Sequence, residues 1–216
     1  MIDGPRIAPA SGGRPKSLVV FLHGYGADGN DLIDLGHQFA PLLPDTAFVS
    51  PNAPDPCPGN PFGREWFPLA EINPRKLLAG VRYAAPALDA FLDAELAAQG
   101  VEDKNLALVG FSQGTMMALH VGLRRKAQIA GIVGYSGVLA GPEVLASEMT
   151  GAPPVLLVHG EADQVVPVMA LHAAAGALGS AKVPVEWHAR PGLPHGIDPE
   201  GLRLGADFLR RTLYGG

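Results

Sequence analysis

The sequence has few of the features that identify several large classes of protein. Its 216 residues include one cysteine, Cys57, so no disulfide can form within the chain and no cysteine-based metal cluster can be built. The N-terminus has no apolar stretch of signal-peptide length and no run anywhere could cross a bilayer, which predicts a cytoplasmic protein without a membrane span. No basic block stands out and the net charge is −5, so we expect no nucleic-acid partner.

The amino-acid composition is typical of a globular protein. Hydrophobic residues make up 47% of the chain and charged residues 17%, a balance that can build a sizeable core. The length fits one domain, so we predict a single domain over residues 1–216 whose first 16 residues are irregular.

Short apolar runs alternate with segments of helical periodicity. Strands are predicted at residues 17–23, 46–50, 104–109, 129–135, 154–159 and 183–188. Helices are predicted at 31–40, 74–99, 113–126, 167–178 and 199–213, and Pro86 should kink or split the second. Several strands are almost wholly apolar, so the fold class is α/β with a mostly parallel sheet covered by helices. The Pro- and Gly-rich stretch 51–68 is long enough to form a binding loop or a lid.

One serine follows a predicted strand and precedes a predicted helix. Ser112 is the centre of Gly110-Phe111-Ser112-Gln113-Gly114, a G-x-S-x-G pattern. Small residues two before and two after the serine relieve the crowding of a sharp turn that exposes the hydroxyl. The helix N-terminus also lets the backbone N–H of Gln113 face a developing negative charge. The pattern in this setting predicts a nucleophile.

A nucleophilic serine needs a base and an acid that orients it, in the chain order serine, acid, histidine. His195 stands in a turn before the last helix and is favoured as the base, since His172 falls in a helix and His188 in a strand. Asp163 follows the strand that ends near Val158 and is favoured as the acid over Glu161. The other carboxylates considered are Glu143, Glu148 and Glu186.

A glycine-rich turn follows the first predicted strand. Gly24, Gly26 and Gly29 have the G-x-G-x-x-G spacing of a dinucleotide-binding loop. That site also needs an acidic residue about twenty positions on, and the end of the next strand carries none. His23 before the turn instead gives His-Gly-x-Gly, which favours backbone N–H groups aimed at an oxyanion. His23 itself is interpreted as a structural hydrogen-bonding residue.

Together these segments resemble one family. Residues 22–28, 110–114, 159–167 and 194–196 are similar to motifs of the phospholipase/carboxylesterase family, which includes acyl-protein thioesterases. The resemblance covers nearly the whole chain and implies a single-domain α/β-hydrolase with little or no cap domain. It implies Ser112 as nucleophile, Asp163 as acid and His195 as base, with no metal and no cofactor.

The resemblance also assigns residues around the reacting atoms. It implies an oxyanion hole from the N–H groups of Tyr25 and Gln113, and places Trp66 and Val165 near an acyl pocket. Tyr25 stands where the family often has leucine, and Thr115 where it often has glycine. The substrate class implied is a small-molecule or acyl-chain ester, with thioester or lysophospholipid hydrolysis as alternatives. The alternative outside enzymes is a ligand-binding module without catalysis on the same scaffold.

Overall fold

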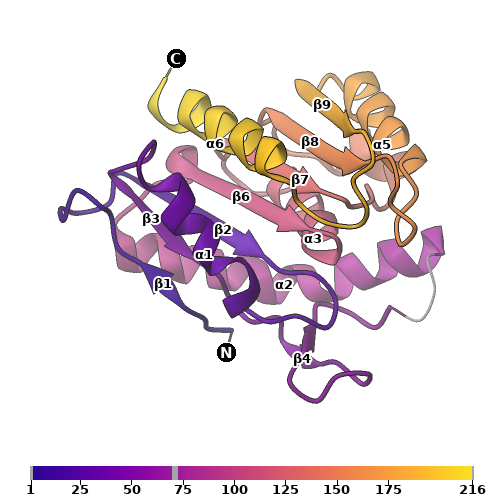
Figure 1. Cartoon of the computed structure of the whole chain (residues 1–216), viewed down its shortest axis with the longest axis horizontal. Helices are drawn as coiled ribbons and strands as arrows, with labels where there is room; N and C mark the ends of the chain where they lie inside the picture. The colour runs from indigo at the N-terminus through magenta and orange to yellow at the C-terminus, as the bar shows by residue number, and fades with distance from the viewer. Residues whose placement is uncertain (1, 70–72, 216) are drawn as a thin grey trace.

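The protein is built around one mixed sheet. A computed structural model describes residues 2–69 and 73–215 of the chain. Seven strands are ordered β1-β3-β2-β6-β7-β8-β9, and only β1 runs antiparallel to its neighbour (Figure 1). They span β1 (Arg6–Ile7), β2 (Ser17–Leu22), β3 (Thr46–Val49), β6 (Leu106–Phe111), β7 (Gly131–Tyr135), β8 (Val155–Gly160) and β9 (Val185–Arg190).

The remaining elements surround this sheet. The helices span α1 (Asn30–Phe39), α2 (Pro74–Gln99), α3 (Gln113–Gly122), α4 (Leu145–Glu148), α5 (Met169–Ser180) and α6 (Pro199–Tyr214). Strands β4 (Asp55–Pro56) and β5 (Arg64–Glu65) form a separate antiparallel hairpin within the long loop 51–68. Among the described residues, none of the helices has both the length and the hydropathy needed to span a membrane.

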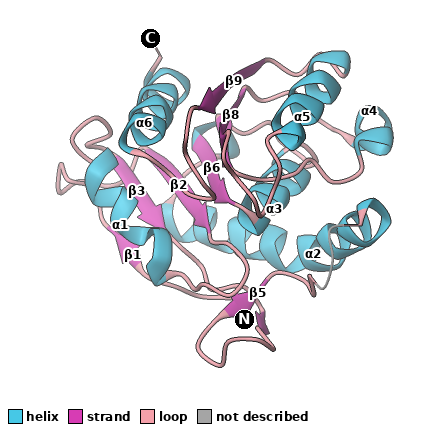
Figure 2. Cartoon of the chain, turned by 45° about the vertical axis from the view of Figure 1, so that its right-hand side comes forward, coloured by secondary structure: helices cyan, strands magenta, loops and turns pink. Residues whose placement is uncertain are grey.

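Helices cover both faces of the sheet, as Figure 2 shows. Alternate residues of β2 point to opposite faces, so Leu18 and Val20 pack with α2, α3 and α5 while Val19 and Phe21 pack with α1 and α6. Strands β2, β6, β7 and β8 are therefore apolar on both sides, which confirms the predicted α/β class with a mostly parallel sheet.

The structure corrects the prediction at the N-terminus and rules out one of the two outcomes predicted for Pro86. The first 16 residues are not wholly irregular, because Arg6 and Ile7 form β1 against Val49 and Phe48. A strand of two residues is too short to give a periodic pattern, so only its partner β3 reveals it. Of the predicted kink or split at Pro86, the split does not occur, because α2 continues through the proline from Pro74 to Gln99. Buried leucines on both sides of the proline hold the helix against the core and outweigh the lost backbone hydrogen bond.

The parallel strands determine where chemistry can occur. The carboxyl ends of β2, β6, β8 and β9 meet at one edge of the sheet, since all four run in the same direction. The loops that follow these strands carry the glycine-rich turn, Ser112, Asp163 and His195. Ligand sites of open α/β sheets lie at this edge.

Candidate active site

Ser112 occupies a strained turn between β6 and α3. Its φ of 54° and ψ of −114° lie outside the regions that non-glycine residues favour. A side chain on Gly110 would collide with the backbone of Gly114, and one on Gly114 would collide with Leu22 of β2. The glycines two before and two after the serine are thus required by packing, as the motif predicts. Ser112 is 8% exposed.

Asp163 and His195 come together across the ends of β8 and β9. The Nδ1–H of His195 donates to Oδ2 of Asp163 at 2.7 Å. A carboxylate only accepts, so this bond fixes the proton of a neutral imidazole on Nδ1 and leaves Nε2 free to accept one. Glu161, the alternative acid, is exposed, and its described contact is a backbone bond from its N–H to Arg190. The structure therefore brings the favoured acid, and not its alternative, to His195.

Asp163 is held by the turn that contains it. Its Oδ1 accepts the N–H groups of Val165 at 2.9 Å and Val166 at 2.8 Å. His159 Nε2 donates to the Val166 carbonyl at 2.8 Å and lies 3.3 Å from Oδ2 of Asp163. Burial by itself raises the pKa of Asp163, but the bonds from His195, Val166 and Val165 outweigh it and the pKa is lowered. Asp163 is thus a fixed carboxylate at neutral pH.

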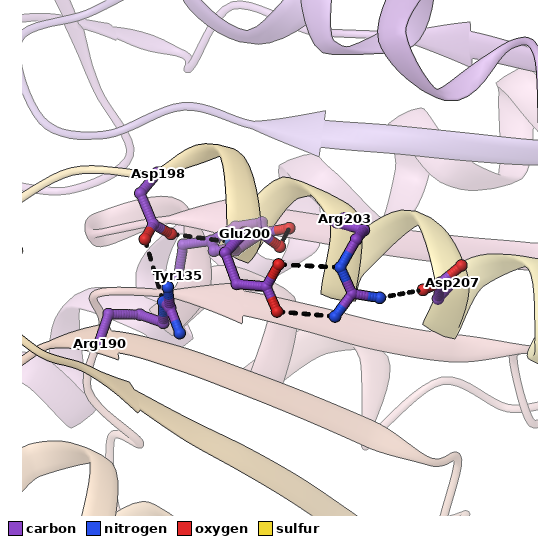
Figure 3. Close-up of polar contacts among 7 residues, drawn as sticks. Tyr135, Arg190, Asp198, Glu200, Arg203 and Asp207 are labelled. Carbon is purple, nitrogen blue, oxygen red and sulfur yellow. Dashed lines mark hydrogen bonds and ion pairs between the residues drawn. The ribbon is translucent and has the colours of Figure 1, made fainter.

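The loop that carries His195 is joined at its two ends. Arg190, at the end of β9, donates from Nε to Oδ2 of Asp198 at 3.0 Å, and Oδ1 of Asp198 caps α6 through the N–H of Gly201 at 2.7 Å (Figure 3). The Tyr135 hydroxyl donates to the Gly201 carbonyl at 3.0 Å and holds α6 on the sheet. These contacts fix the start and the end of the 191–197 segment.

Phe111, the residue before Ser112, packs against His195 and so brings the serine turn close to the histidine. The rings of Phe111 and His195 are 4.9 Å apart between centroids. No hydrogen bond joins the Ser112 hydroxyl to His195 within the described residues. Catalytic hydrogen bonds often tighten only when substrate is bound, so this geometry is compatible with a nucleophile and its base.

The glycine-rich turn lies against Ser112. A methyl group on Gly24 would lie 3.4 Å from Cβ of Ser112, so the turn passes directly beside the serine. Within the described part of the chain, no hydrogen bond uses the N–H of Tyr25 or that of Gln113. Two unused donors next to one serine are the elements of an oxyanion hole.

His23 has no role at the surface of the site. It is fully buried, its Nε2 accepts the N–H of Ala53 at 3.0 Å, and its Nδ1–H donates to the Gly24 carbonyl at 2.8 Å. Burial lowers its pKa, so the ring is neutral. Both nitrogens are occupied, which supports the interpretation of His23 as a structural residue.

The side chain of Gln113 has a function that the motif does not indicate. Its Oε1 accepts the N–H of Trp66 at 2.9 Å and its Nε2 donates to the Phe67 carbonyl at 2.8 Å. Trp66 is 0% exposed and its Nε1–H donates to the His23 carbonyl at 3.0 Å. These bonds attach loop 51–68 to the nucleophile turn. Direct contact of Trp66 with an acyl group stays a prediction, because in this structure its indole is packed inside the domain.

Val165 and Thr115 differ in their access to solvent. Val165 is 57% exposed beside Asp163, where its side chain is accessible to a ligand. Thr115 is buried, its hydroxyl lies 2.8 Å from the carbonyls of Gly110 and Tyr135, and its methyl occupies space that side chains on Gly134 and Gly137 would fill. The side chain of Thr115, at the position where the family often has glycine, therefore points inward and is shielded from solvent.

Four side chains that support the site were not predicted from the sequence, namely those of Gln113, His159, Arg190 and Asp198. Asp198 followed by Pro199 is a helix-start pattern, so the capping role had a signal in the sequence. The contacts of the Gln113 side chain and of His159 join residues far apart in the chain or buried in a strand. No local sequence pattern predicts such contacts.

The sequence of the chain matches a known protein family over almost its whole length. The sequence profile of the family described as Phospholipase/Carboxylesterase matches residues 5–213. The chain belongs to the phospholipase/carboxylesterase family. It is a carboxylic ester hydrolase of the α/β-hydrolase fold.

Individual relatives cover almost the whole chain. Esterase YpfH of Escherichia coli is 31% identical over 92% of this chain and 84% of the relative. Acyl-protein thioesterase 1 of Gibberella zeae is 27% identical over 97% of this chain and 95% of the relative. The crystal structure of esterase PE8 superposes with a TM-score of 0.94 at 46% identity, covering 98% of this chain and 99% of the other.

Proposed function

We propose that this member of the family hydrolyses carboxylic esters through an acyl-enzyme formed on Ser112. The observation that carries the proposal is the 2.7 Å bond from His195 Nδ1 to Asp163, at the sheet edge where Ser112 occupies its strained turn. Neither an isolated serine nor an isolated histidine would need this arrangement. A carboxylate that fixes the imidazole tautomer is what a serine hydrolase requires.

The reaction takes two steps with the same groups. His195 Nε2 removes the Ser112 hydroxyl proton while Oγ attacks the ester carbonyl carbon, and the carbonyl oxygen becomes an oxyanion. The imidazolium then protonates the departing alcohol, which leaves the acyl group on Oγ. Water attacks this acyl-enzyme with His195 again as base, and the carboxylic acid is released. Asp163 stabilises the imidazolium and stays ionised, in keeping with its lowered pKa.

The oxyanion would be held by the N–H groups of Tyr25 and Gln113. Both donors are unused within the described residues, and the turn that carries Tyr25 passes beside Ser112. Donors that are in place before the reaction stabilise developing charge without a reorganisation cost.

The substrate is proposed to be a small-molecule or acyl-chain ester. The exposed Val165 beside Asp163 would contact the acyl group, and loop 51–68 with Trp66 would shape its pocket. Thioester hydrolysis is the second candidate, because one relative of nearly full coverage is named an acyl-protein thioesterase. Comparison of oxygen esters and thioesters with the same acyl chain distinguishes the two.

Covalent labelling with a fluorophosphonate tests the proposal without a chosen substrate. We expect one adduct, mapped to Ser112 by intact mass and peptide analysis, and a loss of about 10⁶-fold in kcat for Ser112→Ala. Ser136 is the matched control, since it also follows a strand with positive φ, at 48°. The Ser136→Ala protein should still form the adduct on Ser112. Folded protein that carries no adduct, or carries it on another serine, would refute the assignment.

A further inference from the structure

His159 is a second histidine close to the proposed acid, and it lies inside the domain. It is the last residue but one of β8, and its side chain is 2% exposed. The cavity that it lines with Thr115, Leu119 and Leu171 has a volume of about 10 Å³, which is room for one water molecule at most. A substrate group does not fit there, so His159 can influence the reaction only through its protein neighbours.

Two oxygen atoms determine which nitrogen of His159 carries a proton. Nε2 lies 2.8 Å from the Val166 carbonyl oxygen and 3.3 Å from Oδ2 of Asp163. A carbonyl and a carboxylate only accept hydrogen bonds, so the proton is on Nε2 and is donated to Val166. The same N–H group stays in electrostatic contact with Oδ2, the oxygen that His195 binds.

Val166 connects His159 to the carboxylate. Its own N–H donates to Oδ1 of Asp163 at 2.8 Å, next to the bond from the N–H of Val165 at 2.9 Å. Val166 is 2% exposed, so water cannot replace a hydrogen bond that is lost at its backbone. His159 therefore holds Val166, and Val166 holds one oxygen of Asp163.

The two ends of the acid turn are held by different parts of the protein. At its start, the N–H of Ala162 donates to the Leu193 carbonyl at 3.0 Å. A side chain on Gly160 would collide with the same carbonyl, so the turn begins in direct contact with the loop that carries His195. At its other end, the bond from His159 joins the turn to β8. The distance between the acid and the base depends on both attachments.

We propose that His159 is a positioning residue, which holds the 163–166 turn so that Asp163 keeps its bond to His195. The inference rests on the proposed esterase function of Ser112. A displacement of about 1 Å at a catalytic group can lower a rate by about 10²-fold. We therefore expect loss of the His159 bond to lower kcat by about 10- to 10²-fold. KM should change little, because the ring does not reach the substrate.

Two amide side chains at position 159 test the role of this donor. The amide of glutamine extends about as far as Nε2 of histidine, whereas that of asparagine extends only as far as Nδ1. His159→Gln should keep the donor to Val166 and stay within about threefold of the native kcat, while His159→Asn should lose about 10- to 10²-fold. The assay is hydrolysis of p-nitrophenyl butyrate, with kcat expressed per chain that takes the fluorophosphonate adduct. A native kcat in His159→Asn, or an equal loss in both variants, would overturn the inference.

A double-mutant cycle shows whether His159 acts through Asp163. In an Asp163→Asn background, His159→Asn should change kcat by a factor close to one, because no carboxylate is left to position. A general loosening of the fold would lower kcat by the same factor in both backgrounds, and this result would contradict the proposal. His120→Asn is the matched control, since His120 is also buried and its Nδ1 has no hydrogen-bond partner among the described residues. Its effect should be small and equal in both backgrounds.

A further variant covers the case in which His159→Asn does not fold. His159→Leu then replaces it in both comparisons, because leucine also lacks the donor and adds no polar group to the interior. The outcomes are separate from those of the esterase proposal. A native protein that cleaves p-nitrophenyl butyrate and takes the adduct on Ser112, with the same kcat in the His159 variants, refutes only the positioning role. A native protein that does neither refutes the proposed function.

Discussion

His23 and His195 both precede a glycine at the carboxyl edge of the sheet, yet their surroundings differ. His23 is fully buried and both ring nitrogens bond to the backbone, at Ala53 and Gly24. His195 is part-exposed, and one nitrogen bonds to the carboxylate of Asp163. The first ring can neither take up a proton easily nor reach a ligand. The second keeps a nitrogen for proton transfer.

The comparison shows that the type of residue at a strand end does not decide its role. Burial removes His23 from proton chemistry, because a charged ring in the interior would lose its hydration without gaining a carboxylate. His195 has the carboxylate of Asp163 as its partner, which would stabilise an imidazolium in the proposed reaction. The partner of each histidine, rather than its motif, separates a structural ring from a proposed catalytic one.

Replacing each histidine by alanine should give opposite results. His195→Ala should lose about 10⁵- to 10⁶-fold in kcat with little change in Tm, because the ring is part-exposed. His23→Ala should lower Tm by several degrees, because two buried backbone groups lose their partners at about 1–3 kcal/mol each. Its activity per folded molecule should fall far less. Kinetics and thermal melts of the two proteins check this. A His23→Ala protein of native Tm that is as inactive as His195→Ala would contradict the distinction.

The next largest effect should distinguish the two carboxylates near His195. Asp163→Asn should lower kcat by up to about 10⁴-fold, because an amide no longer holds the imidazole in the tautomer that can accept the serine proton. Glu161→Gln is the matched control and should retain nearly full activity, since its side chain is exposed and no hydrogen bond joins it to His195 among the described residues. Steady-state kinetics on one ester suffice. If Glu161→Gln is the inactive variant, the acid has been assigned wrongly.

Substitution of Gln113 should have the smallest effect on catalytic activity. Its backbone N–H survives any substitution, so Gln113→Ala should lose far less activity than Ser112→Ala. We expect a fall in stability of about 2–4 kcal/mol, because the Trp66 N–H and the Phe67 carbonyl are left buried without partners. Gln113→Glu keeps an acceptor for Trp66 but buries a carboxylate against the Phe67 carbonyl, so it should be no more stable than Gln113→Ala. Denaturant unfolding measures all three proteins. A loss of activity in Gln113→Ala equal to that of Ser112→Ala would count against the backbone N–H as the contributing group.

Local patterns in the sequence were sufficient to predict the scaffold. Apolar runs such as Val155–Val158 predicted buried parallel strands, and helical periodicity with Pro74 and Gly100 at the ends predicted α2. The spacing of Gly110 and Gly114 around Ser112 predicted the strained turn, because only small residues fit there. These predictions succeeded since each depends on residues close together in the chain.

The sequence alone determined the α/β class, the order of the candidate residues and the turn that carries Ser112. Only the tertiary structure decided that Asp163 rather than Glu161 meets His195, that His23 is enclosed, and that the Gln113 side chain anchors Trp66. The physical reason is the same in each case. These outcomes depend on which distant groups come within hydrogen-bond distance and which lose contact with water, and the packing of the whole sheet sets both.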